Sequence, residues 1–286
     1  MKFGVTLPQT EIGADVGFIK RFAQRAEALG FDYLLAYDHV LGADPTNRPG
    51  WTGYTAKDSF HEPFVLFGWL AAVAPKLEYA AGVIILPQRQ TALVAKQAAE
   101  VELLTEGKLR LGVGIGWNQV EYEALGENFH TRGRRLEEQI ALLRALWTEP
   151  IVTFEGKNHR VTEAGLNPMP IQQPIPIWMG GMSEIAIRRA GRLADGWMAN
   201  GHADASLIRR VEVLREAAIE AGRDPDSIGI DGRLSAVDFP VEEWPAEIER
   251  WRNAGATHVS IATMRAGYTL DQHIEAIERF KEAASR

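Results

Sequence analysis

The feature that most constrains this chain is an alternation of short apolar runs with amphipathic stretches, repeated eight times along the sequence. The runs have the length of β-strands, whereas the stretches place apolar side chains at helical spacing. We expect strands at Lys2–Leu7, Tyr33–Tyr37, Glu78–Leu86, Arg110–Val113, Pro176–Met179, Gly196–Met198, Ile228–Ile230 and His258–Thr263. We expect helices at Val16–Leu29, Phe64–Ala74, Thr91–Thr105, Val120–Leu125, Arg134–Trp147, Ser183–Leu193, Ala205–Ala221, Val241–Ala254 and Leu270–Ala284.

Alternating strands and helices predict a parallel sheet, because each helix returns the chain to the starting edge of the sheet. Eight such units in 286 residues favour a closed (β/α)8 barrel, the TIM barrel. At about 150 residues per domain this length could also hold two domains. No stretch has the character of an interdomain linker, so we expect one α/β barrel domain over residues 1–286.

Two insertions interrupt the alternation. Residues 41–60 are rich in Gly, Pro, Asn, Asp and Thr, and residues 149–174 hold a strand-like Val152–Phe154 and a Pro-rich exit. Barrels carry functional insertions beside the C-terminal ends of their strands. We therefore expect both insertions to cover the barrel mouth and to set the choice of substrate.

Composition excludes several classes of protein. The chain has no cysteine, which excludes disulfides, thiolate nucleophiles and cysteine-ligated metal clusters. The histidines are scattered without an H-x-x-x-H pair, and no G-x-S-x-G motif is present. We thus expect neither a metal site nor a Ser-His-Asp hydrolase.

Charge and hydropathy point to a small-molecule enzyme. The net charge of −7 argues against a nucleic-acid partner. No apolar run approaches the roughly 18 residues needed to cross a bilayer. The N-terminus enters a strand pattern without the apolar core of a signal peptide, so we expect a cytoplasmic protein and no membrane partner.

The first candidate site residues follow the second predicted strand. His39 comes directly after Tyr33–Tyr37 and beside Asp38, which places it at the mouth of a barrel. A histidine there can donate a proton or bind a cofactor ring, and the adjacent acid can orient it. A loop histidine that caps the next segment would show the same pattern.

Two glycine-rich turns are the next candidates. Gly180-Gly181-Met182-Ser183 joins a strand to a helix, where backbone N–H groups can bind a phosphate, although a tight turn with Ser183 as N-cap is the simpler interpretation. Gly112, Gly114 and Gly116 begin inside a strand, which argues against a dinucleotide fingerprint. They either leave room for a flat ring or fill the taper of the barrel.

Aromatic and basic side chains complete the candidates. Trp117, just past its strand, can wall a planar ligand, whereas Trp178 and Trp197 fit core packing better. The basic run at 132–135 (Arg132, Arg134 and Arg135) is a solvated face or an anion contact. Together these residues indicate a planar, phosphate-bearing cofactor over a barrel mouth.

Several motifs, in this order, carry a resemblance to a known family. They are Lys2-Phe3-Gly4-Val5, Gly30-Phe31-Asp32, Asp38-His39, Gly82-Val83-Ile84-Ile85-Leu86-Pro87, Ala95-Lys96-Gln97, Gly107-Lys108-Leu109, the 112–118 block GVGIGWN, Glu121, Glu123-Ala124-Leu125-Gly126, Pro176-Ile177-Trp178-Met179-Gly180-Gly181 and Ala194-Asp195-Gly196-Trp197. The chain resembles the bacterial luciferase-like flavin and deazaflavin oxidoreductases, especially the branch that depends on coenzyme F420. The match covers nearly the whole length.

The resemblance implies a (β/α)8 barrel with an isoalloxazine-type ring at its C-terminal mouth. It implies a non-proline cis peptide at Gly82–Val83 behind the ring, His39 near the reacting carbon, with Asp38 beside it, and the Gly180–Ser183 turn near the cofactor phosphate. Relatives are commonly homodimers. At Ala43 and Trp117 the chain departs from a tryptophan and a glutamate of the sugar-phosphate dehydrogenases, so their substrate cannot be carried over.

The function expected from the resemblance is hydride transfer between F420 and a small organic substrate. One alternative is an FMN-dependent monooxygenase of the same superfamily, since deazaflavin lacks the ring nitrogen at which flavins activate oxygen. A second alternative is a barrel that binds a flavin or F420 without catalysis.

Overall fold

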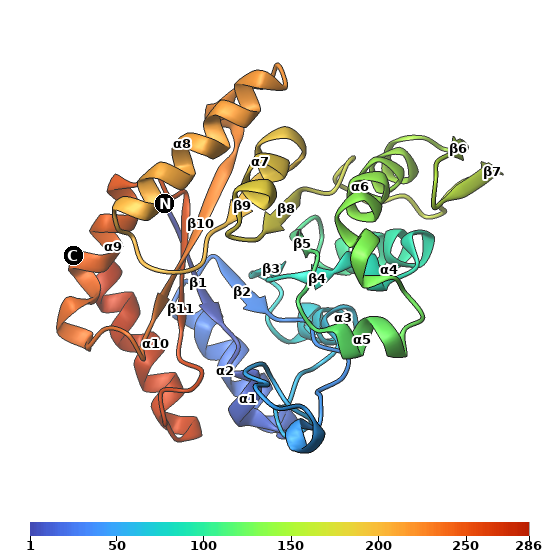
Figure 1. Ribbon diagram of the computed structural model, residues 1–286. Coiled ribbons are helices and arrows are strands. Elements are labelled where there is room, and N and C mark those ends of the chain that lie inside the picture. Colours follow the sequence, from blue (N-terminus) through green and yellow to red (C-terminus); the bar gives the residue numbers. More distant parts are fainter. Residues whose placement is uncertain (286) are drawn as a thin grey trace.

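Eight parallel strand positions close into a barrel in the computed structural model, which describes residues 1–285 (Figure 1). Around the barrel the order is β3/β4, β2, β1, β11, β10, β9, β8 and β5, and pairing of β3 with β5 closes the ring. The strands are β1 (Lys2–Thr6), β2 (Tyr33–Ala36), β3 (Glu78–Ala81), β4 (Ile84–Ile85), β5 (Leu109–Gly114), β8 (Ile177–Gly180), β9 (Gly196–Met198), β10 (Gly229–Ser235) and β11 (His258–Ala262). The predicted TIM-barrel fold is confirmed.

Helices form the outer layer around the strands (Figure 1). They are α1 (Gln9–Ile12), α2 (Val16–Ala28), α3 (Pro63–Val73), α4 (Thr91–Leu104), α5 (Gln119–Ala124), α6 (Arg132–Thr148), α7 (Glu184–Leu193), α8 (Ala205–Glu220), α9 (Trp244–Asn253) and α10 (Leu270–Ala284). Helix α2 shows why the sequence folds this way: Phe18 and Phe22 are fully buried on one face, and the Asp15 side chain caps the first turn.

Two strands differ from the sequence prediction. The predicted strand Glu78–Leu86 is split into β3 and β4 by the Gly82–Val83 peptide, which is cis. Strand β10 is longer than the predicted Ile228–Ile230, because it continues through Asp231 and Arg233. Parallel strands are normally apolar, so charged residues make such a strand hard to recognise in the sequence. Here Asp231 and Arg233 both line the cavity at the barrel mouth.

The first insertion lies at the barrel mouth, as predicted. Its two ends are joined by a bridge between Ala43 and Thr55, and a short 3-10 turn spans Pro45–Asn47. Tyr54 of this insertion lines the cavity formed by the strand ends.

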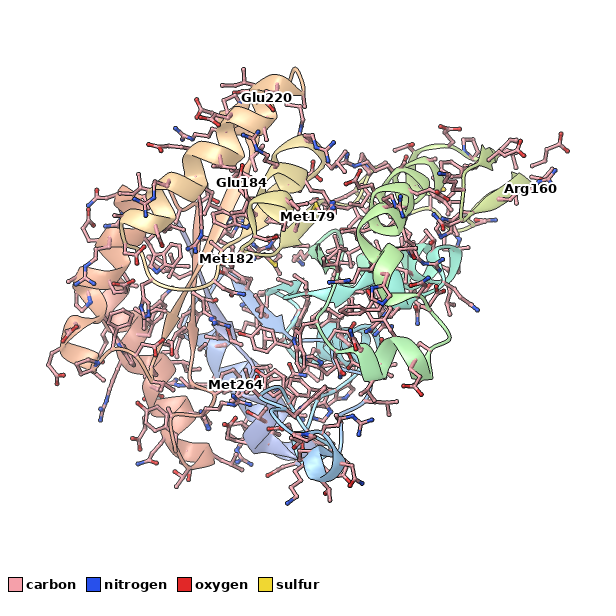
Figure 2. The ribbon with its side chains drawn as sticks, viewed as in Figure 1. Arg160, Met179, Met182, Glu184, Glu220 and Met264 are labelled. Carbon is pink, nitrogen blue, oxygen red and sulfur yellow. The ribbon has the colours of Figure 1, made fainter. Side chains whose placement is uncertain are left out.

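The second insertion does not cover the mouth, which corrects the expectation from sequence. It forms the antiparallel hairpin of β6 (Val152–Glu155) and β7 (Arg160–Ala164), and Figure 2 shows Arg160 at the periphery of the molecule. His159 at its tip contacts Glu138 of α6 at 2.7 Å and Thr91 of α4 at 2.8 Å. The hairpin follows a helix, so it starts at the opposite end of the barrel and packs on the outer helices.

A network of polar side chains lies inside the barrel, beneath the cavity at the C-terminal ends of the strands. Arg110 lies between the rings of Tyr33 and Trp178, at 4.4 and 4.5 Å from their centroids. Its Nη1 donates to Asp231 Oδ2 at 2.8 Å, and the Tyr33 hydroxyl donates to Asp231 Oδ1 at 2.7 Å. Burial and the Asp231 carboxylate raise the pKa of the Tyr33 hydroxyl well above its usual value. These contacts hold the side chains of the network in place, and the network forms the floor of the cavity.

Candidate functional site

A cavity of about 380 Å³ opens at the C-terminal ends of the strands. This volume lies in the range of small-molecule sites. The structure brings most of the predicted site residues to its wall, namely Asp38, His39, Gly82, Val83, Trp117, Gly180 and Gly181. Met182 and Ser183 directly follow Gly181 after β8 but are not part of the cavity wall; Met182 is labelled in Figure 2.

One wall of the cavity is built around Val83. A Cβ atom placed on Gly114 would lie 2.6 Å from Val83 Cγ2, and one placed on Gly180 would lie 3.0 Å from Val83 Cγ1. Side chains at either position would collide with Val83 or displace it. Gly114 and Gly180 thus leave room for the Val83 side chain, and together with Gly82 these residues form one wall of the cavity, the Val83 wall.

His39 is held on the wall of the same cavity by a buried acid. Its Nδ1 lies 3.1 Å from Glu121 Oε1, and Glu121 is 1% exposed. Glu121 also accepts from the backbone N–H of Val40 at 2.9 Å and from Gln88 Nε2 at 3.2 Å. Burial raises the pKa of Glu121, but the hydrogen bonds from His39, Gln88 and the backbone outweigh it, and the pKa is lowered. An ionised Glu121 accepts only, so Nδ1 is the donor and Nε2 remains for a ligand.

Aromatic rings surround the His39 imidazole. The ring centroids of Tyr54, Phe60 and Trp117 lie 5.0, 4.7 and 5.6 Å from that of His39. Gly53 of the first insertion packs directly on the Trp117 indole. The insertion therefore covers the histidine and reduces its contact with water.

Asp38 does not orient His39, which corrects the sequence-based interpretation. Its carboxylate accepts from Arg89 Nη2 at 2.8 Å and from the backbone N–H of Ile85 at 3.0 Å. Asp38 thus ties the end of β2 to the segment around β4. The orienting acid is Glu121, which the sequence does not reveal because it lies 82 positions from His39.

Comparison with known proteins identifies the family. A model described as luciferase-like monooxygenase matches residues 1–238. The chain belongs to the luciferase-like monooxygenase family. Members of this family are flavin- or F420-dependent oxidoreductases or monooxygenases.

Curated relatives of this luciferase-like protein include characterised and uncharacterised members. It is 34% identical over 279 residues to an uncharacterised protein of Mycobacterium tuberculosis, covering 94% of this chain and 92% of the relative. It is 32% identical over 232 residues to the FMNH2-dependent dimethylsulfone monooxygenase of Pseudomonas putida, covering 80% of this chain and 60% of that one.

Solved structures share the fold. The monooxygenase RslO1 from Streptomyces bottropensis superposes with a TM-score of 0.80 at 20% identity, covering 99% of this chain and 98% of that one. An F420-dependent secondary alcohol dehydrogenase in complex with an F420-acetone adduct gives a TM-score of 0.70 at 21% identity, covering 99% and 90%. A monooxygenase and an F420-dependent dehydrogenase thus share the fold of this luciferase-like protein.

The turn after β8 has the conformation that the sequence predicts for a helix start. Ser183 Oγ accepts from the Ala186 backbone N–H at 3.3 Å and caps α7. Trp197 Nε1 donates to the Gly181 carbonyl at 2.9 Å, and Gly181 has a φ of +131°, which only glycine adopts readily. The N-cap is confirmed, and the phosphate contact stays a prediction.

The basic run lies outside the cavity. Arg132 Nη1 donates to the Phe129 carbonyl at 2.6 Å, and Arg135 pairs with Glu127 at 2.6 Å. The cavity wall includes neither of these arginines nor Arg134. The structure thus gives no support to an anion contact at this run.

The cavity is also lined by three residues that were not predicted as site residues from the sequence. Tyr37 and Arg233 meet across the mouth, where Arg233 Nη1 donates to the Tyr37 hydroxyl at 2.8 Å, and Tyr54 lies above His39. The only signal for Arg233 was its two-residue spacing from Asp231, which matches one face of a strand.

Residues 1–285 contain neither a cluster of metal ligands nor a membrane-spanning helix. No group of three or more His, Asp or Glu side chains there could bind a metal ion. No helix in this range combines the length and the apolar character of a membrane span.

The Val83 wall gives a prediction about cofactor binding. Gly114→Ala should weaken binding of a ring cofactor by about ten- to a hundredfold, because its Cβ would displace the Val83 side chain into the place of the ring, and relieving such an overlap costs about 1–3 kcal/mol. Binding would be measured by fluorescence titration with F420 and with FMN. Gly68→Ala is the matched control: Gly68 lies in helix α3, and the new Cβ would meet only Leu104 at 3.6 Å. Equal affinity of the two variants would contradict a ring on the Val83 wall.

Proposed function

We propose that this protein transfers a hydride between coenzyme F420 and a small organic substrate at the barrel mouth. The observation that carries the proposal is His39, fixed by Glu121 through Nδ1 on the wall of the cavity that also contains the Val83 wall. When bound, the deazaflavin ring supplies the carbon that accepts or donates the hydride. The protein orients the ring and the substrate and excludes water from the site.

The cofactor fits the residues at the mouth. The Val83 wall offers an apolar side chain that Gly114 and Gly180 allow to sit close to the strands, and the turn after β8 offers backbone N–H groups at the start of α7. We therefore assign ring support to the Val83 wall and phosphate binding to the turn. The proposed cofactor-binding residues are Asp38, Gly82, Val83, Trp117, Gly180, Gly181, Met182 and Ser183.

We assign the proton transfer to His39. Protonated at both ring nitrogens, it donates from Nε2 to a substrate oxygen, while Glu121 stabilises the positive charge through Nδ1. Tyr54, Phe60 and Trp117 limit the access of water to the imidazole. The pocket thus combines a held proton donor with a surface for a ring.

We further propose that the enzyme is a homodimer, as the resemblance implies, and that its substrate is a small molecule. A cavity of about 380 Å³ has room for a compact ligand beside part of a cofactor. The net charge of −7 argues against a nucleic acid as substrate.

A second candidate is an FMN-dependent monooxygenase. The observation in its favour is the 32% identity to the FMNH2-dependent dimethylsulfone monooxygenase of Pseudomonas putida. The two candidates share the ring site and differ in whether molecular oxygen is consumed. A protein that only binds a flavin or F420 is the third candidate.

Binding and oxygen dependence separate these candidates. We expect the purified protein to bind F420 at least about tenfold more tightly than FMN, a difference of about 1.4 kcal/mol. Turnover of the F420-loaded protein should proceed without oxygen, as followed by F420 absorbance in an anaerobic cell. Tighter binding of FMN together with oxygen-dependent turnover would establish the monooxygenase instead. Binding of either cofactor without turnover on any substrate would favour the third candidate.

A further inference from the structure

Arg233 is a cation in the cavity wall, and no carboxylate within residues 1–285 lies at ion-pair distance from it. It lies on β10, in register with Ser260 of β11, and both residues line the cavity. Its Nη1 donates to the Tyr37 hydroxyl at 2.8 Å. Within residues 1–285, no acidic side chain forms an ion pair with Arg233, and its Nε and Nη2 donate no hydrogen bond to protein.

The carboxylates of the cavity are already engaged elsewhere. Asp38 pairs with Arg89 at 2.8 Å, and Asp231 pairs with Arg110 at 2.8 Å. Glu121, just behind the wall, accepts from His39 at 3.1 Å. Within residues 1–285 the Tyr37 hydroxyl is the hydrogen-bond partner of Arg233, and the exposed Asp238 carboxylate acts on its charge from beyond ion-pair distance. Removing a charge from water without an opposite charge costs free energy that an anionic ligand would restore.

Arg233 stays charged in this position. The adjacent Tyr37 hydroxyl raises the pKa of the guanidinium, which outweighs the effect of burial. The Arg265 guanidinium packs 4.6 Å from the centroid of the Tyr54 ring at the mouth, but it already pairs with Asp58 at 3.9 Å. Arg233 is therefore the cation at the mouth that can accept an anionic ligand, although the whole chain is acidic.

The order of the strands separates Arg233 from the Val83 wall. Strand β10 is four positions from β3/β4 in an eight-position barrel, so the two lie on opposite sides of the mouth. A ring resting on the Val83 wall would turn its other face toward Arg233 and Tyr37. That face is where a substrate must approach the ring.

We propose that Arg233 binds an anionic oxygen group, a carboxylate or a sulfonate, on the substrate. The proposal rests on the proposed function, because it takes the ring to lie on the Val83 wall. Tyr37 holds the guanidinium from one side through Nη1, which leaves Nε and Nη2 free to donate in parallel. This edge matches the two oxygens of a carboxylate or sulfonate. Arg233 thereby selects anionic substrates and fixes their orientation toward the ring.

The test compares matched anionic and neutral probes. Benzoate is compared with benzamide, and methanesulfonate with dimethyl sulfone, by calorimetric titration of the apoprotein and of the cofactor-loaded protein. We expect the anionic member of each pair to bind about ten- to a hundredfold more tightly, as for hydrogen bonds to a charged group. Arg233→Gln should abolish this preference.

Two further variants keep the proposal testable if Arg233→Gln does not fold. Arg233→Lys keeps the charge without the planar fork, so it should retain part of the preference. Tyr37→Phe removes the hydroxyl and keeps the ring, so it should retain the full preference. Thermal melting of each variant reports whether it is folded. If Arg233→Gln does not fold, a Lys variant with undiminished binding of benzoate would overturn the bidentate contact.

The remaining outcomes are also decisive. Equal binding of anionic and neutral probes by the wild-type protein, or an unchanged preference in Arg233→Gln, would overturn the proposal. The proposal would also be overturned if Arg233→Gln lost affinity for the cofactor but kept the preference for anionic probes, because Arg233 would then bind the cofactor. The apoprotein titrations remain informative even if neither F420 nor FMN binds, so failure of the proposed function is distinguishable.

Discussion

His39→Ala is expected to lower turnover of the cofactor-loaded enzyme by about two to four orders of magnitude, because a positioned general acid contributes that much. The imidazole lies on the cavity wall and is held by Glu121 at 3.1 Å. The measurement is kcat under the cofactor and oxygen conditions that support activity. Affinity for the ring cofactor, measured in parallel, should change far less. Unchanged turnover would contradict the assignment of the proton transfer to His39.

Glu121→Gln tests whether this acid positions and charges His39. The variant keeps an oxygen acceptor near Nδ1 and removes the negative charge that stabilises an imidazolium. We expect a smaller loss of kcat than in His39→Ala, little change in KM, and a descending limb of the pH–rate profile moved to lower pH. A purely structural role for Glu121 would lower the thermal stability and leave the shape of the profile unchanged.

Asp231→Ala is expected to reduce the free energy of unfolding by about 3 kcal/mol, the lower end of the cost of breaking a buried ion pair, because Arg110 loses the partner of Nη1 but keeps Glu78 at 2.7 Å from Nε. Arg110 is 3% exposed between two aromatic rings, and the Tyr33 hydroxyl also loses its acceptor. The measurement is urea denaturation of the apoprotein. Asp231→Asn, which keeps an acceptor oxygen, should be intermediate.

The matched control for this pair is an ion pair on the surface. Glu249 pairs with Arg252, and both side chains are about half exposed. Glu249→Ala should change the free energy of unfolding by less than about 0.5 kcal/mol, as is usual for exposed pairs. A similar small effect of Asp231→Ala would mean that the floor of the cavity relaxes to admit water to Arg110.

The sequence predicted the parts of the site that depend on local chain geometry. The ends of parallel strands meet at one face of any barrel, so residues placed after strands had to converge there. His39, Trp117 and Gly180 line the cavity for this reason. The resemblance added the cis peptide at Gly82–Val83, which the structure contains.

Predictions based on sequence neighbours were less successful. Asp38 is adjacent to His39 in the chain, yet its carboxylate pairs with Arg89, which lies 51 positions away. Arg233 lies in a polar segment that the sequence pattern does not identify as a strand. The segment forms a strand because its polar side chains face the interior of the barrel. Adjacent residues of an extended segment point in opposite directions, so proximity in sequence did not mean contact.

The sequence by itself determined the barrel, because the alternation of apolar strands and amphipathic helices can bury its faces in few other ways. Only the tertiary structure decided which groups meet at the mouth. The contacts of His39 with Glu121 and of Tyr37 with Arg233 join residues 82 and 196 positions apart. Such contacts depend on the closure of the barrel and on the direction of each side chain. Neither is encoded in a local pattern of residues.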